Sequence, residues 1–166
     1  MYNKILVPLD GTHLAETALR HALDLSRGTG ARIILVNAAQ DSLAAVPEAR
    51  VNVPSRQVYA SAIRGMMYLQ TVANRLRGEG ERVQCDVLEG DPAPAILSCA
   101  RRENVDVIVM GTHRRYPLSW VSRMIKGSVA GSVAAAANRP VILVKEVETD
   151  RREPAGQDSR ELAEAA

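Results

Sequence analysis

The chain has 166 residues, of which 46% are hydrophobic and 24% charged, and its formal net charge is +2. This size and composition are typical of one soluble globular domain with a core of its own. The small net charge gives no reason to expect a nucleic-acid partner, and no apolar run approaches the ~20 residues of a membrane-spanning helix. The first residues enter a strand directly, without the basic and long apolar regions of a secretion signal, so we expect a cytoplasmic protein.

The first half of the chain alternates short apolar runs with apolar residues at helical spacing. An apolar run without alternation indicates a strand that is buried on both faces, and helical spacing indicates an amphipathic helix. The predicted elements are a strand over 4–9, a helix over 14–25 that is ended by Gly28-Thr-Gly30, a strand over 32–38, a loop over 40–55 and a helix over 56–78.

The second half continues this alternation. Polar and apolar side chains alternate over 83–88, which suits a strand near the edge of a sheet. Asp91 can cap the following helix, and Pro92 suits its first position, where no N–H is needed. The remaining predicted elements are a strand over 105–110 that stops at Gly111, a long connection over 111–126, a helix over 127–137 and a strand over 141–144.

Five strands that alternate with helices predict an α/β fold: a single-domain, open, five-stranded parallel sheet with helices on both faces, which is Rossmann-like. We assign this domain to residues 1–146. Residues 147–166 are charged and contain Pro154 and Gly156, so we expect a disordered tail. Cys85 and Cys99 show no CxxC spacing and no nearby His cluster, so we expect buried structural thiols and no metal site.

Two glycines frame the most informative part of the chain. Gly111 ends the fourth predicted strand, and Gly127 with Ser128 opens the alanine-rich helix. Small residues let the backbone approach a phosphate, and the free N–H groups at a helix start point toward it. Ligands of open α/β sheets bind beyond the carboxyl ends of the strands, where the strand order reverses, and Asp10 ends the first strand. The sequence therefore predicts one crevice that is shared by Asp10 and both glycines.

Two of these residues have a second interpretation. Asp10 can accept a hydrogen bond from a ribose or a base, or it can be a turn residue that bonds its own loop. Ser128 can hold a phosphate together with the backbone of Gly127, or it can be an ordinary residue at a helix start. The sequence leaves both alternatives open.

Five segments carry a resemblance to a known family. They are Ile5-Leu-Val-Pro-Leu-Asp-Gly-Thr12, Val87-Leu-Glu-Gly-Asp-Pro92, Asp106-Val-Ile-Val-Met-Gly-Thr-His113, Gly127-Ser-Val129 and Arg139-Pro-Val-Ile-Leu-Val144. In these segments the chain resembles a universal stress protein domain of the adenine-nucleotide α-hydrolase-like superfamily. The resemblance implies the sheet order 3-2-1-4-5, a role in the stress response and a homodimer that pairs through the last strand, between Val141 and Val144.

One branch of that family binds ATP through the motif Gly-x2-Gly-x9-Gly-[Ser/Thr], in which Gly111 would be the first glycine and Gly127 the last. The second motif glycine falls on Arg114 and a further family glycine on Pro117. Gly111 and Gly127 are 16 positions apart, against 13 in the motif. The resemblance implies that Asp10 and Ala38 face the adenosine and that Ser128 and its neighbours face the phosphates. The adenine-nucleotide site implied in this way comprises Pro8, Leu9, Asp10, Ala38, Met110, Gly111, Arg114, Gly127, Ser128 and Val129.

Arg114 itself has two opposed interpretations. Its side chain can fill the space that a glycine would leave and so block the nucleotide, or its guanidinium can pair with a phosphate. The surrounding loop is basic, which would attract an anion or an acidic partner, or it can be an ordinary solvated loop. Trp120 in this loop can form part of a contact surface, or it can pack across the mouth of the crevice. The other basic residues of the loop are His113, Arg115, Arg123 and Lys126.

These features favour a dimeric, cytoplasmic stress-response protein that binds ATP, with Mg²⁺, or a related adenine nucleotide. The alternative is a family member that has lost nucleotide binding and acts through an unknown protein partner. A phospho-acceptor receiver domain fits poorly, because Asp10 lacks an acidic neighbour and the third strand ends at Glu89-Gly90. An enzyme also fits poorly: His13 and His21 lack His-x-x-His spacing, and no acid–base pair converges. Slow ATP hydrolysis is the most that we expect.

Overall fold

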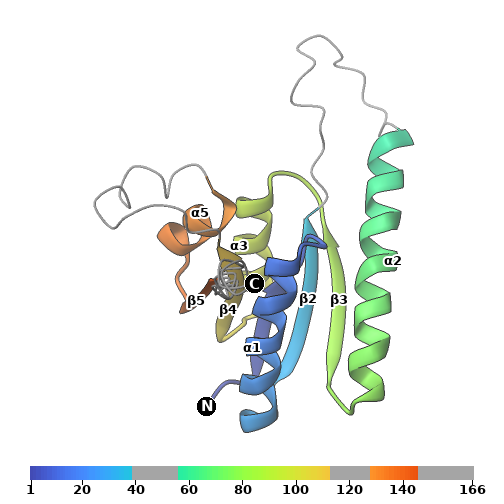
Figure 1. The fold of residues 1–166 in the computed structure, drawn as a ribbon. Coiled ribbons are helices and arrows are strands. Elements are labelled where there is room, and N and C mark those ends of the chain that lie inside the picture. The colour runs from blue at the N-terminus through green and yellow to red at the C-terminus, as the bar shows by residue number, and fades with distance from the viewer. Residues whose placement is uncertain (39–55, 113–127, 146–166) are drawn as a thin grey trace, which may run out of the picture.

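The computed structural model describes residues 1–38, 56–112 and 128–145 (Figure 1). In chain order the elements are β1 (Lys4–Pro8), α1 (His13–Thr29), β2 (Arg32–Ala38), α2 (Arg56–Gly78), β3 (Val83–Leu88), α3 (Pro92–Arg102), β4 (Val107–Thr112), α5 (Val129–Ala136) and β5 (Val141–Lys145). All strand pairs are parallel, and the order across the sheet is β3-β2-β1-β4-β5. The predicted fold class and sheet order are confirmed. None of the described helices is long and apolar enough to cross a membrane.

Helices cover both faces of the sheet. Ile5 and Ile33 belong to the core between the sheet and the helices α1 and α2. Leu6 and Ile34, their neighbours along the strands, belong to the core on the other face, beneath α3 and α5. Successive residues of a strand point to opposite faces of the sheet. When helices cover both faces, neighbouring residues along the strand must therefore both be apolar. This explains why β1 and β2 read as continuous apolar runs in the sequence.

The ends of the helices differ from the sequence prediction in two places. Helix α1 continues through Gly28 and ends at Thr29, and Gly30 caps it in the left-handed conformation, with φ of 70°. Only the second of the two predicted stop glycines therefore ends the helix. At the start of α3, Pro92 takes the first helical position as predicted, but the side chain of Asp91 makes no capping hydrogen bond. Asp91 therefore occupies the predicted cap position, but only its carbonyl bonds to the helix, by accepting from the Ala95 N–H.

The sequence predicted that the fourth strand stops before Gly111, but β4 continues through this residue to Thr112. Gly111 pairs with Val144 and Thr112 pairs with Lys145, so the strand follows β5 for two more residues. A glycine is tolerated within this strand because the partner strand supplies the ladder and another element packs against the bare backbone. The predicted start at 105 and the observed start at Val107 differ by an amount that is usual for element boundaries.

The sheet divides at its centre. β1 pairs with β4 only at Ile5 with Val107 and at Leu6 with Ile108. Beyond these pairs β1 stays with β2 as far as Pro8, whereas β4 stays with β5 as far as Thr112. β1 and β4 therefore part toward their carboxyl ends, at the point where the strand order reverses. This is the position at which open α/β sheets hold their ligands.

The two edges of the sheet are finished differently. β3 is an edge strand, as its alternating pattern predicted. The carbonyl of Arg82 bonds to β2 through the N–H of Ile33, so the carbonyl of Val83 points outward. The guanidinium of Arg77 in α2 donates to this Val83 oxygen through Nη2 at 2.9 Å. Within the described ranges no strand pairs with the outer side of β5, where Leu143 is 38% exposed.

A carboxylate anchors the beginning of β1. Asp106 Oδ2 accepts hydrogen bonds from the backbone N–H groups of Asn3 at 2.7 Å and Lys4 at 2.9 Å. The Asp106 N–H in turn donates to the carbonyl of Lys4. The bonds from Asn3 and then from Lys4 hold the pKa of the Asp106 carboxyl below its ordinary value, because they stabilise the charged form.

We expect this anchor to make stability depend on pH. Since the pKa of Asp106 is lowered in the folded state, its stabilisation is fully present above the unfolded pKa and is lost as pH falls through the folded pKa. Asp106→Ala should therefore lower the free energy of unfolding at pH 7, and the gap between variant and wild type should shrink toward pH 2. Urea titrations of both proteins at several pH values measure this gap. A gap that stays constant with pH would contradict the prediction.

Candidate functional site

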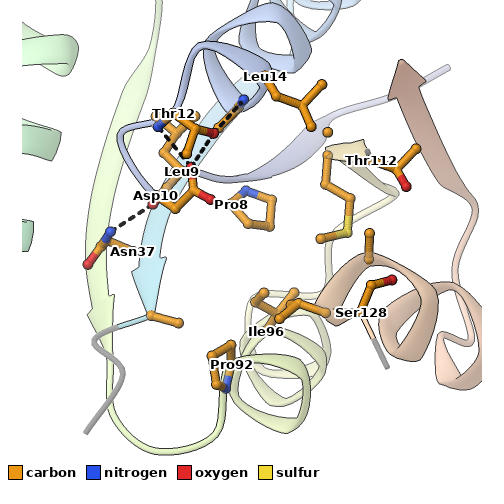
Figure 2. A pocket seen from close by; sticks show the side chains of 16 residues that line it. Pro8, Leu9, Asp10, Thr12, Leu14, Asn37, Pro92, Ile96, Thr112 and Ser128 are labelled. Atoms are coloured by element: carbon orange, nitrogen blue, oxygen red, sulfur yellow. Dashed lines mark hydrogen bonds between the residues drawn. The ribbon is translucent and has the colours of Figure 1, made fainter. Parts of the chain in front are cut away.

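A cavity of about 440 Å³ lies at the carboxyl ends of the strands, where β1 and β4 part (Figure 2). Figure 2 shows Asp10 and Asn37 on one side of it, Ser128 and Thr112 on the other, and Pro92 and Ile96 of α3 along its floor. The walls are mostly apolar, while polar side chains stand at the two ends. This combination is typical of small-molecule sites.

Of the ten residues that the sequence singled out, eight line this cavity and two, Arg114 and Gly127, lie outside the described residues. The eight are Pro8, Leu9, Asp10, Ala38, Met110, Gly111, Ser128 and Val129. Helix α5 begins at Val129 with Ser128 as its N-cap, two residues after the predicted start at 127. The basic residues at 113–126 and Trp120 also lie outside the described residues.

The sequence interpretation missed the other half of the lining. Thr112 was assigned to a connection because β4 was ended too early. The remaining missed residues had no local chemical signal. Asn37 lies on β2 beside Ala38, and the others reach the cavity because α1, α3 and α5 pack against the strands; these are Thr12, Leu14, Ala15, Pro92, Ile96 and Ala130.

The turn between β1 and α1 holds Asp10 rigidly. Asp10 Oδ1 accepts from the Thr12 N–H at 2.9 Å and from the Thr12 hydroxyl at 2.6 Å, and Thr12 caps α1 by accepting from the Ala15 N–H at 3.2 Å. Gly11 adopts a φ of 82°, which a side chain would strain. The turn-residue interpretation of Asp10 is therefore correct. Its second oxygen, Oδ2, makes no hydrogen bond within the described part of the chain and remains an acceptor at the cavity.

Ser128 is the N-cap of α5. Its Oγ accepts from the Gly131 N–H at 3.0 Å, and its carbonyl accepts from the Ser132 N–H at 2.9 Å. The helix-start interpretation of Ser128 is thus correct. The N–H groups of Val129 and Ala130 belong to the first turn, which has no partners inside the helix, and both residues line the cavity. These N–H groups and the positive end of the helix dipole favour an anion at this end.

Gly111 allows helix α1 to pack closely on β4. A Cβ atom at this position would stand 2.6 Å from Leu14 Cγ and 2.9 Å from the Leu14 carbonyl oxygen. A backbone atom cannot move aside cheaply, so a side chain here would push α1 away from the sheet. The first glycine of the motif therefore serves packing between α1 and β4 in addition to lining the cavity.

Three titratable groups near these elements are perturbed by burial. Burial raises the pKa of the Tyr68 hydroxyl in α2, and the nearby carboxylates of Glu16 and Asp10 raise it further. Burial also raises the pKa of the thiols of Cys85 and Cys99. Both thiols are free, with Cys99 buried and Cys85 partly buried, which fits the predicted structural role. Among residues 1–38, 56–112 and 128–145, no group of three or more His, Cys, Asp or Glu could hold a metal ion.

The sequence model of the universal stress protein family matches residues 1–145. The chain belongs to the universal stress protein family. A curated universal stress protein from Methanothermobacter thermautotrophicus is 34% identical over 150 residues, which cover 89% of this chain and 98% of that protein. A solved structure of a universal stress protein from Methanocaldococcus jannaschii is 27% identical with a TM-score of 0.71, and covers 90% of this chain and 99% of that one.

Some universal stress proteins of this fold have been solved with nucleotides. One from Archaeoglobus fulgidus is in complex with dAMP; it is 24% identical with a TM-score of 0.59, covering 87% of this chain and 98% of that one. One from Arabidopsis thaliana has AMP bound; it is 16% identical with a TM-score of 0.58, covering 88% of this chain and 93% of that one. At these identities the likeness shows the shared fold.

The packing role of Gly111 can be tested by adding a single methyl group. Gly111→Ala should lower the free energy of unfolding by about 1–3 kcal/mol, because the new Cβ would overlap the backbone of Leu14. Gly28→Ala is the matched control, since a Cβ at Gly28, inside α1, meets nothing within 4 Å. The control should leave stability unchanged or raise it by up to ~1 kcal/mol. Equal effects of the two substitutions in urea unfolding would show that Gly111 has no special packing role.

Proposed function

We propose that this universal stress protein binds an adenine nucleotide, ATP with Mg²⁺ or a related one, in the cavity between β1 and β4. The observation that carries the proposal is the convergence of two anchored elements on one cavity of about 440 Å³: the Asp10 turn and the capped start of α5. The size lies within the range of small-molecule sites. One end presents a carboxylate acceptor and the other presents the N–H groups at the start of α5, with apolar walls between them.

This polarity matches the parts of a nucleotide. The second carboxylate oxygen of Asp10, Oδ2, can accept from a ribose hydroxyl or from an exocyclic amine of a base, and Ala38 and Ile96 offer apolar contact to a flat ring. The N–H groups of Val129 and Ala130 and the Ser128 hydroxyl, whose hydrogen is free to donate, can hold a phosphate. The AMP and dAMP found in two structures of the same fold supply the choice of adenine, which the cavity by itself does not specify.

We also place this protein in the cytoplasm as a homodimer that pairs through β5. The absence of any strand against the outer side of β5 within the described ranges, and the exposed Leu143 on that strand, support pairing there. At the other edge, Arg77 donates to the outward carbonyl of Val83, which leaves β3 less able to pair with another strand. The edge of β5 is therefore the better surface for a second copy.

The phosphate end of the site is tested by Ser128→Asp. Aspartate caps a helix as well as serine does, so α5 should keep its stability, but its negative charge would repel a phosphate. Calorimetry should show AMP bound at least about tenfold more weakly than by wild type, with adenosine affinity nearly unchanged. Ser128→Thr is the control that keeps both the cap and the hydroxyl.

Two outcomes of this titration would count against the nucleotide proposal. Equal losses for adenosine and AMP would show that no phosphate lies at Ser128. No binding of AMP, ADP or ATP by wild type, with or without Mg²⁺, would remove the proposal altogether and leave the second candidate function.

The dimer interface is tested by Leu143→Pro. Because Pro140 and Ile142 direct their backbone groups toward β4, the N–H of Leu143 points to the outer edge. Proline is tolerated where the missing N–H faces outward, but it blocks addition of another strand. Light scattering should give a dimer for wild type and the 18.0 kDa of one chain for the variant. A monomeric wild type, or a folded variant that stays dimeric, would refute pairing through β5.

The second candidate is a family member that has lost nucleotide binding and acts through protein contacts. Arg114 stands where the family motif has a glycine, and the interval to Gly127 is lengthened. Helix α2 also exposes large apolar side chains on adjacent turns, with Ile63 at 58% and Met67 at 65% exposure. Exposed apolar side chains that gather on one element are typical of protein contact surfaces.

A further inference from the structure

Asn37, the penultimate residue of β2, stands between the cavity and helix α2. Its Nδ2 donates to the carbonyl oxygen of Leu9 at 2.8 Å, the bond drawn in Figure 2. The N–H of Leu9 donates to the carbonyl of Val36 at 2.7 Å. Both backbone polar groups of Leu9 are thus held by the end of β2. Asp10, the next residue, begins its turn from a point that cannot shift without breaking one of these bonds.

The other side of the Asn37 amide contacts α2 at a glycine. Gly65 is buried, and a Cβ added there would stand 2.5 Å from Asn37 Oδ1 and 3.1 Å from Asn37 Cγ. Helix α2 therefore approaches Asn37 as closely as a bare backbone allows. Because the amide is held by Leu9 on one side and by Gly65 on the other, movement of α2 toward the sheet must displace either Asn37 or the Leu9 carbonyl.

We propose that Asn37 is a positioning residue that couples helix α2 to the Asp10 turn of the nucleotide site. This rests on the proposed function, since the ligand whose binding it adjusts is the adenine nucleotide. Asn37 donates one N–H to the Leu9 carbonyl and its oxygen lies toward Gly65, so the amide stands between the Asp10 turn and helix α2. A shift of α2 changes the position of Asp10, and a nucleotide held by Asp10 restrains α2 by the same free energy.

The position of Tyr68 agrees with this connection. Tyr68, one helical turn after Gly65, packs against the core that is shared by α1 and α2. Burial raises the pKa of its hydroxyl, and the carboxylates of Glu16 and then Asp10 raise it further. Tyr68 of α2 therefore lies within electrostatic range of the Asp10 turn.

A double-mutant cycle on Asn37 and Gly65 tests the coupling. Gly65→Ala and Asn37→Ala should each weaken AMP binding by roughly three- to tenfold, the equivalent of about one hydrogen bond. Each should also speed hydrogen exchange of the Leu9 and Thr12 amides, which NMR detects without any ligand. In the Asn37→Ala background, Gly65→Ala should have no further effect on either measurement, because the clash has lost its partner.

Gly78→Ala is the matched control on the same helix, because a Cβ there meets nothing within 4 Å. It should leave AMP affinity and the Leu9 exchange rate unchanged. If Asn37→Ala does not fold, Asn37→Asp keeps the shape but cannot donate to the Leu9 carbonyl. Its exchange rates, compared with wild type, then take the place of the Asn37→Ala measurement.

The possible outcomes distinguish the coupling through Asn37 from nucleotide binding itself. Additive effects of Gly65→Ala and Asn37→Ala, or a Gly65→Ala that behaves like Gly78→Ala, would overturn the coupling. If wild type binds no AMP, the proposed function fails. The exchange rates at Leu9 and Thr12 then still decide whether Asn37 links α2 to the turn.

Discussion

The parting of β1 and β4 is the constraint on which the rest of this structure depends. The two strands pair only at Ile5 with Val107 and at Leu6 with Ile108, and each then follows its outer neighbour. The chain that leaves β1 leads to α1 on one face of the sheet, and α5, the next described helix after β4, lies on the other face, so the gap opens between these two helices. The cavity therefore results from the order in which the strands are connected, and the Asp10 turn and the start of α5 form its two ends.

Close approach of backbone to neighbouring elements shapes both sides of that gap. Gly111 lets α1 rest on β4, and Gly65 lets α2 rest on Asn37. A single added carbon would meet the Leu14 backbone at Gly111 and the Asn37 amide at Gly65. A glycine near a cavity is easily interpreted as a place for ligand phosphates. Here the absent side chain makes room for the protein's own backbone or amide, which aligns the polar groups that a ligand would meet.

Most of the fold could be predicted from the sequence, because apolar runs, capping residues and glycines act locally. The buried strands and the helix stop near Gly30 followed from such patterns. The end of β4 did not, because Gly111 breaks a strand pattern on its own and only its pairing with Val144 in β5 continues the strand. Asn37 and Ile96 could not be recognised either, since an isolated amide or a core isoleucine becomes part of a site only when separate elements pack together. Gly111 and Ser128, near the two ends of the predicted motif, could be recognised because each is a residue type suited to an anion site and each lies next to the end of a predicted element.

The unequal edges of the sheet also limit how copies of this chain can assemble. A sheet with two open edges can add strands on both sides, and such growth continues into fibres. Here the guanidinium of Arg77 already occupies the outward carbonyl of Val83. If copies associate by strand pairing, the edge of β5 is then the favoured one, and a two-fold axis through that edge would close the assembly after two copies. Arg77 on α2 would thereby favour a closed dimer over an open fibre.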